Sequence, residues 1–124
     1  MSVVSMMLHP DRAEAAELAV QIVSYLTDSG HSVRLLDKEA VGINCSESGC
    51  AEDDFATGAD LAVSVGGDGT MLRTFELVAS SDVPVLGINV GHLGYLTEFE
   101  ADEAQSAIDL ALSGRLPVED RLMV

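Results

Sequence analysis

The residues best suited to chemistry form a Gly-Gly-Asp-Gly-Thr sequence at positions 66–70, directly after the apolar run 61–65 and directly before a helix-like segment, 71–79. Glycines let the backbone adopt positive φ and approach a ligand closely, while the first amides of a following helix point at any anion there. The pattern therefore predicts a phosphate-binding turn. A carboxylate at such a turn would repel phosphate, so its presence indicates a chemical role of its own. Asp68 is expected either to hold a magnesium ion or to accept a proton from an attacking hydroxyl.

A second glycine-punctuated loop, 91–97, follows the apolar segment 83–89, and a proline near the start of that segment suits the first residues of a strand. The two apolar segments 61–65 and 83–89 are consecutive strands in this interpretation, and each loop leaves the carboxyl end of its strand. Ligands bind at that edge in open α/β sheets. The two loops are therefore expected to face each other across one cleft.

Hydrophobic periodicity predicts the elements that must position this edge. Residues 2–8 form a buried strand, and a turn with Asp11 as N-cap leads into a helix with one apolar face. Gly30 is expected to end that helix in a left-handed conformation, and residues 31–36 form the second strand. This β-α-β unit implies parallel strands joined by a right-handed crossover.

The remaining segments extend the same layered pattern. Residues 37–60 are polar and rich in Gly, Ser and Asn, which predicts a variable connection with a helical turn at 52–55 and little chemistry. A helix is predicted at about 102–112, and the extended segment 117–124 suggests a partner element or a second domain. The expected fold class is α/β, with an open, mostly parallel sheet and flanking helices.

The composition describes one globular domain. The chain has 124 residues and 48% hydrophobic content, which allows a core without disulfide or metal staples. No apolar run approaches the ~18 residues that span a bilayer, and the start lacks the features of a signal peptide, so a cytoplasmic location is expected. Cys45 and Cys50 are expected to be free thiols in a reducing cytosol, with a redox-sensitive disulfide between them as the alternative.

Acidic residues dominate the charge, because 21 Asp and Glu against 6 Lys and Arg give a net charge of −15. Nucleic acid and anionic membranes are therefore not expected as partners, since neither gains by counterion release at such a surface. Any anionic ligand must be bound locally, against the overall field. The dispersed acidity suits a protein from the high-salt cytoplasm of a halophile, and an ordinary acidic bacterial protein is the alternative.

Residues 61–99 resemble the N-terminal domain of NAD kinases. That family pairs a Gly-Gly-Asp-Gly-Thr loop with a later Gly-Ile-Asn-x-Gly-x-Leu-Gly-aromatic-Leu sequence, and here these occur at 66–70 and 87–96. The resemblance implies a Rossmann-like α/β domain at 1–116 that carries the glycine loop. It also implies that 117–124 start the connection to an all-β C-terminal domain, which is absent from these residues.

The resemblance implies transfer of the terminal phosphoryl of ATP, or of polyphosphate in some members, to the 2′-hydroxyl of the adenosine ribose of NAD, giving NADP. Asp68 matches the family's proton acceptor. Gly69 matches a neighbouring NAD contact, and Gly66 and Gly67 match the phosphate-facing turn.

Three further residues match the family's binding positions. Arg73 matches a basic residue that contacts the dinucleotide, and its guanidinium could reach phosphate oxygens in a fork. Tyr95 and Leu96 match residues on the adenine side of the pocket. ATP and NAD are thus the implied substrates, a divalent metal such as Mg²⁺ is expected with the nucleotide, and the full-length protein is expected to be a homo-oligomer.

The family's second-domain sequences, an Asn-Glu or Asn-Asp pair and a Thr-Pro-Thr-Gly-Ser-Thr-Ala-Tyr-like segment, do not occur in these residues. Because phosphoryl transfer needs positioning and charge stabilisation from several groups at once, the 124 residues alone are expected to be inactive or barely active. Two alternatives remain open. One is a noncatalytic dinucleotide-binding or oligomerisation module, and the other is a fragment of a diacylglycerol-kinase-like lipid kinase, which shares the Gly-Gly-Asp-Gly sequence.

Overall fold

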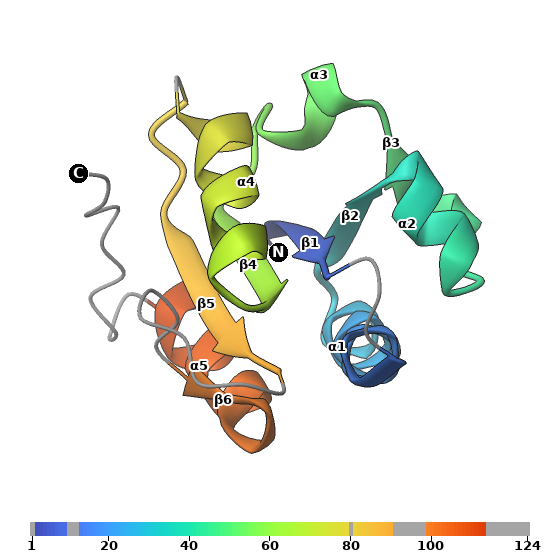
Figure 1. Ribbon diagram of the computed structural model, residues 1–124, viewed down its shortest axis with the longest axis vertical. Coiled ribbons are helices and arrows are strands. Elements are labelled where there is room, and N and C mark those ends of the chain that lie inside the picture. Colours follow the sequence, from blue (N-terminus) through green and yellow to red (C-terminus); the bar gives the residue numbers. More distant parts are fainter. Residues whose placement is uncertain (1, 10–12, 80, 91–98, 114–124) are drawn as a thin grey trace.

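The computed structural model describes residues 2–9, 13–79, 81–90 and 99–113, which form one parallel sheet with helices on both faces (Figure 1). Six strands lie in the order β3-β2-β1-β4-β5-β6, and every neighbouring pair is parallel. The strands are β1 (Val3–Leu8), β2 (Ser32–Leu36), β3 (Gly49–Cys50), β4 (Leu61–Gly66), β5 (Val85–Asn89) and β6 (Phe99–Glu100). The expected fold class is confirmed.

The helices divide between the two faces of the sheet. The helical elements are α1 (Ala13–Asp28), α2 (Asp37–Gly42), α3 (Glu52–Phe55), α4 (Asp68–Val78) and α5 (Ala104–Leu112), with 3₁₀ turns η1 (Ser46–Ser48) and η2 (Ala101–Glu103). Helices α1 and α5 cover one face, and α3 and α4 cover the other (Figure 1). Each face has its own apolar cluster, as expected for a sheet whose parallel strands are buried on both sides.

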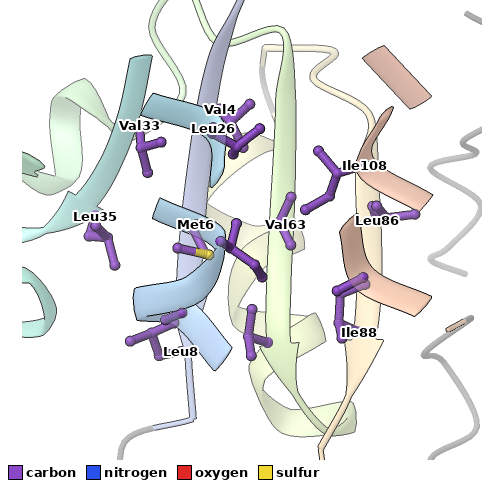
Figure 2. Packing of buried hydrophobic residues seen from close by; sticks show 14 of the residues in the cluster. Val4, Met6, Leu8, Leu26, Val33, Leu35, Val63, Leu86, Ile88 and Ile108 are labelled. Carbon is purple, nitrogen blue, oxygen red and sulfur yellow. The ribbon is translucent and has the colours of Figure 1, made fainter. Parts of the chain in front are cut away.

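Helix α1 buries the apolar face that its spacing predicts. Four of its side chains are fully buried against the sheet: Ala15, Ala19, Ile22 and Leu26. The chain then reverses at Gly30, whose φ of +90° is a left-handed conformation that glycine adopts without a steric penalty. Figure 2 shows Leu26 of α1 in one cluster with Met6 and Val63 from the central strands and Ile108 of α5.

The parallel β1-α1-β2 opening and the helical turn at α3 are confirmed, but other parts of the sequence-based expectation differ from the structure. Helix α4 begins at Asp68, inside the glycine sequence, and not at residue 71. Strand β5 begins at Val85 and not at 83, and the polar stretch 37–60 contains α2 and β3 as well as α3. The predicted N-cap Asp11 and the segment 117–124 lie outside the described residues.

Cys45 and Cys50 are both free thiols, as expected; Cys45 directly precedes η1, and Cys50 is the last residue of β3. Burial raises the pKa of each thiol, and the negative charge of Glu47 adds to the effect at Cys45. A raised pKa lowers the thiolate fraction and with it the reactivity of the sulfur. Within the part of the chain that the structure describes, no helix is long and apolar enough to cross a membrane.

Candidate functional site

The glycine turn lies at the carboxyl edge of the sheet, where β4 passes into α4. Gly66 is the last residue of β4, Gly67 is the N-cap of α4, and Asp68 is the first residue of the helix. Gly67 has an extended backbone, with φ −129° and ψ −155°. Among the described glycines, positive φ occurs only at Gly30 and Gly58, so the positive φ expected for this turn is wrong.

Close packing, and not a left-handed backbone conformation, explains why Gly66 is a glycine. A Cβ built on Gly66 would lie 2.6 Å from Thr70 Oγ1 and 2.9 Å from His9 Cβ. Thr70 is 4% exposed and sits over the end of β4, one turn into α4. Gly67 and Gly69 differ, because a Cβ on either would have no neighbouring atom within 4 Å. The turn is thus packed on its inner side and open on its outer side, which leaves main-chain groups accessible to a ligand.

Asp68 occupies the first turn of α4 and is partly exposed at this open side. A helix N-terminus carries a partial positive charge, which favours a carboxylate at this position. The structure therefore places an acid beside helix amides that also suit phosphate, the combination expected from the sequence.

The end of β5 lies beside the glycine turn. Gly66 pairs with Asn89 across the two parallel strands, and the amide of Val90 donates to the carbonyl of Gly66 at 2.9 Å. The segment that leads into the second loop thus emerges next to the first, as expected. The second loop, which includes Tyr95 and Leu96, falls in 91–98 and lies outside the described residues.

Asn89 has a buried amide at this junction. Its side chain is 5% exposed, and Oδ1 has no hydrogen-bond partner within the described part of the chain. Ser64, two residues before Gly66 on β4, has a buried Oγ in the same condition. Strand alternation puts both side chains on the α4 face, so the sheet beneath the turn is polar at this point.

A cleft of about 740 Å³ opens on the other side of the turn, over the carboxyl ends of β1 and β2. Thirteen residues from the two strands, the helices and β3 line it: Leu8, His9, Ala16, Leu36, Asp37, Lys38, Glu39, Gly42, Ile43, Cys50, Ala51, Glu52 and Arg73. Most of them belong to the stretch 37–60, where little chemistry was expected. The sequence showed no motif there, because the cleft forms only when that stretch meets β1 and α4.

The basic residues of this acidic protein gather at the cleft. Of the three lysines and arginines in the described ranges, Lys38 and Arg73 line it. The third, Arg34, donates from Nη1 to the carbonyls of Asp54, at 2.7 Å, and Thr57, and so fixes α3 against β2. Lys38 and Arg73 are both exposed and available to a ligand in the cleft.

Glu39 is a partly buried carboxylate in the same cleft. Its Oε1 accepts a hydrogen bond of 3.1 Å from the amide of Leu8, the last residue of β1. Burial raises the pKa of Glu39 above its ordinary value of 4.5, and the hydrogen bond from Leu8 and the charge of Arg73 oppose the rise. Glu39 therefore joins α2 to the end of β1 and lies within electrostatic reach of Arg73.

No group of three or more His, Cys, Asp or Glu side chains in the described residues could hold a metal ion without further ligands. Mg²⁺ in phosphoryl-transfer sites usually keeps several waters and binds through one or two carboxylates plus the phosphates of the substrate. The residues present are compatible with an ion that arrives with a nucleotide.

Comparison with known proteins identifies the architecture. The family model described as the ATP-NAD kinase N-terminal domain matches residues 4–116. The chain belongs to the NAD kinase family. The resemblance seen in the glycine loop and in the segment 87–96 is therefore confirmed, and the lipid-kinase alternative, which depended on Gly-Gly-Asp-Gly alone, is set aside.

Relatives in this family agree along most of the chain. The NAD kinase of Moorella thermoacetica is 37% identical over 121 residues, which cover 98% of this chain and 39% of that protein. The NAD kinase of Methanothermobacter thermautotrophicus is 37% identical over 117 residues, covering 92% of this chain and 40% of that protein. The chain thus spans about two fifths of the length of these curated relatives.

Solved structures share the fold. Yeast NADH kinase complexed with NADH superposes with a TM-score of 0.83 at 23% identity, covering 93% of this chain and 39% of that one. An NAD kinase from Archaeoglobus fulgidus in complex with ATP gives a TM-score of 0.63 at 22% identity, with 92% and 38% covered. At these identities the likeness establishes the α/β architecture alone.

Proposed function

We propose that this chain supplies the catalytic aspartate and the phosphate-binding turn of an NAD kinase, which transfers the terminal phosphoryl of ATP to the 2′-hydroxyl of the adenosine ribose of NAD. The observation that carries the proposal is the position of Asp68, at the N-terminus of α4 between two open glycines, in a chain of the NAD kinase family. Polyphosphate is the alternative donor.

In this proposal Asp68 accepts the proton of the 2′-hydroxyl of NAD while the 2′-oxygen forms a bond to the terminal phosphorus of ATP. The bond between that phosphorus and the bridging oxygen breaks, and ADP leaves with the electron pair. Gly66 and Gly67 shape the turn against the phosphates, and Gly69 contacts NAD. Such transfers depend mainly on positioning and charge stabilisation, so main-chain amides and nearby cations carry much of the effect.

Arg73 is proposed as a phosphate contact. The resemblance assigned it to the dinucleotide, whereas its position in the cleft over β1 and β2 favours the phosphates of whichever nucleotide occupies that cleft. Tyr95 and Leu96 are proposed, on the resemblance alone, to line the adenine side of the NAD pocket. Mg²⁺ bound to the nucleotide would neutralise phosphate charge, and this chain would meet it through the phosphates.

The relatives are more than twice as long as this chain, so we also propose features of a longer protein. Residues 1–116 form one domain, and 117–124 begin the connection to the next. The full-length protein is a cytoplasmic homo-oligomer, and the 124 residues alone have little or no activity. Binding of NAD or ATP without turnover is what a noncatalytic module would show.

The test is NADP formation from NAD and ATP by the complete polypeptide that contains these residues. We expect Asp68→Asn to lower kcat by about 10²- to 10⁴-fold, the usual contribution of a general base, with a smaller change in the KM for either substrate. Asp28→Asn removes the same charge from the exposed end of α1 and serves as the control. Unchanged kcat in Asp68→Asn would refute the assignment.

A further inference from the structure

We propose that Asp37 binds the ribose hydroxyls of the nucleoside triphosphate donor, and that it thereby makes the site prefer ATP to a phosphate donor without a nucleoside. The inference rests on the proposed function. It adds the place of the donor nucleoside and the residue that recognises it.

Topology puts Asp37 at a defined point of the sheet. Strands β2 and β3, which follow β1 along the chain, lie on one side of β1 in the sheet. The next strands, β4 and β5, lie on its other side. The direction changes between β1 and β4, and open α/β sheets bind nucleotides at the carboxyl end of such a point. In the dinucleotide-binding version of this strand order, an acidic residue at the end of the second strand accepts hydrogen bonds from ribose hydroxyls. Asp37 directly follows β2.

The side chain of Asp37 lies in the cleft beside strand β3. It is exposed and lines the cleft over β1 and β2. A Cβ built on Gly49 of β3 would lie 2.4 Å from Asp37 Oδ1, so the carboxylate rests directly on a strand that has no side chain there. The neighbouring strand thus makes room for this carboxylate at the rim of the cleft.

The distance from Asp37 to the glycine turn suits a triphosphate. Strand β1 separates β2 from β4, and two strand spacings amount to about 10 Å. That is comparable with an extended triphosphate chain, which would run from a ribose at Asp37 to a terminal phosphate at Gly67. Lys38 and Arg73 line the same cleft as Asp37, and Arg73 belongs to α4, the helix that begins at the glycine turn. Both supply positive charge for the phosphates.

The charges of the cleft argue against a purely anionic ligand. Asp37, Glu39 and Glu52 line it together with Lys38 and Arg73. Glu39 already accepts the Leu8 amide, so its carboxylate is partly engaged. Asp37 would repel a bare polyphosphate, whereas the two ribose hydroxyls of ATP can donate hydrogen bonds to it. The ribose therefore explains an exposed acid in a phosphate-binding cleft.

The experiment measures the KM of three donors, with NADP formation by the complete polypeptide as the readout: ATP, 2′,3′-dideoxyATP and inorganic tripolyphosphate. For Asp37→Asn we expect the KM for ATP to rise about 10- to 100-fold, the usual effect of losing hydrogen bonds to a charged acceptor. The KM for dideoxyATP should be high in both proteins, and that for tripolyphosphate should stay constant or fall. Asp53→Asn removes the same charge from exposed α3 outside the cleft lining and should leave all three unchanged.

Three results would overturn the inference. The first is equal KM values for ATP and dideoxyATP in the parent protein, and the second is an unchanged KM for ATP in Asp37→Asn. The third is an Asp37→Asn variant in which the KM for NAD rises and the KM for ATP does not. The first comparison needs no variant, so it decides the matter even if Asp37→Asn folds poorly. If no donor yields NADP, the proposed function fails. Calorimetry then measures the dissociation constants of ATP and dideoxyATP. A preference of at least ten-fold for ATP that is lost in Asp37→Asn supports the role of Asp37, and equal dissociation constants refute it.

Discussion

Gly66 and Gly67 are adjacent in the sequence but meet different surroundings in the folded protein. A Cβ built on Gly66 would lie within 3 Å of Thr70 Oγ1 and of His9 Cβ, whereas a Cβ built on Gly67 would have no neighbouring atom within 4 Å. We expect Gly66→Ala to lower the free energy of unfolding by roughly 1–3 kcal/mol, because the added methyl overpacks the junction of β4, β1 and α4.

Gly67→Ala is the matched control for that substitution. Its φ of −129° is accessible to alanine and the added methyl meets no atom, so we expect only the cost of alanine at an N-cap, up to about 1 kcal/mol. Urea unfolding of both variants measures the difference. Equal stabilities would show that the close approach at Gly66 is not what requires glycine there.

At the scale of elements, Glu39 joins α2 to the end of β1 through the Leu8 amide. Burial raises the pKa of this carboxyl above 4.5, so the folded state holds the proton more tightly than the unfolded state. Its contribution to stability is therefore present below about pH 4.5 and declines as the pH rises through the folded-state pKa. Glu39→Gln keeps an acceptor for Leu8 without the charge.

We expect the unfolding free energy of Glu39→Gln, relative to the parent protein, to increase as the pH rises from about 5 to about 8. Urea titrations at several pH values measure it. Glu17→Gln removes the same charge from the exposed face of α1 and controls for the change in net charge. A relative stability that fell with pH would contradict the sign derived from burial.

The whole molecule carries a net charge of −15. Mutual repulsion of surface carboxylates destabilises the compact state, and salt screens it over a Debye length of about 8 Å at physiological ionic strength. We therefore expect the midpoint of urea unfolding to increase with added NaCl at pH 7. The effect should shrink near the isoelectric point of about 4.1, where the net charge vanishes. A salt response of equal size at both pH values would refute screening as its cause.

The strands and the larger helices could be predicted because their signals are local. Strand β4 reads as an apolar run since both of its faces are covered, and α1 shows its buried stripe at helical spacing. The start of α4 was predicted three residues late, because glycines and an aspartate are poor helix formers. The packing of Thr70 against Gly66 accompanies the earlier start.

The sequence by itself determined the family, the parallel α/β architecture and the placement of Asp68 at the carboxyl end of a strand, because each depends on residues that are neighbours along the chain. Only the tertiary structure decided that Asp37, Glu39 and Arg73 share one cleft. Asp37 and Glu39 belong to α2, which follows β2, and Arg73 belongs to α4, which follows β4. The two segments share no local pattern, and parallel pairing of β1 with β2 and β4 brings them together. Contacts between distant segments depend on strand order and register, which hydrophobic periodicity does not specify.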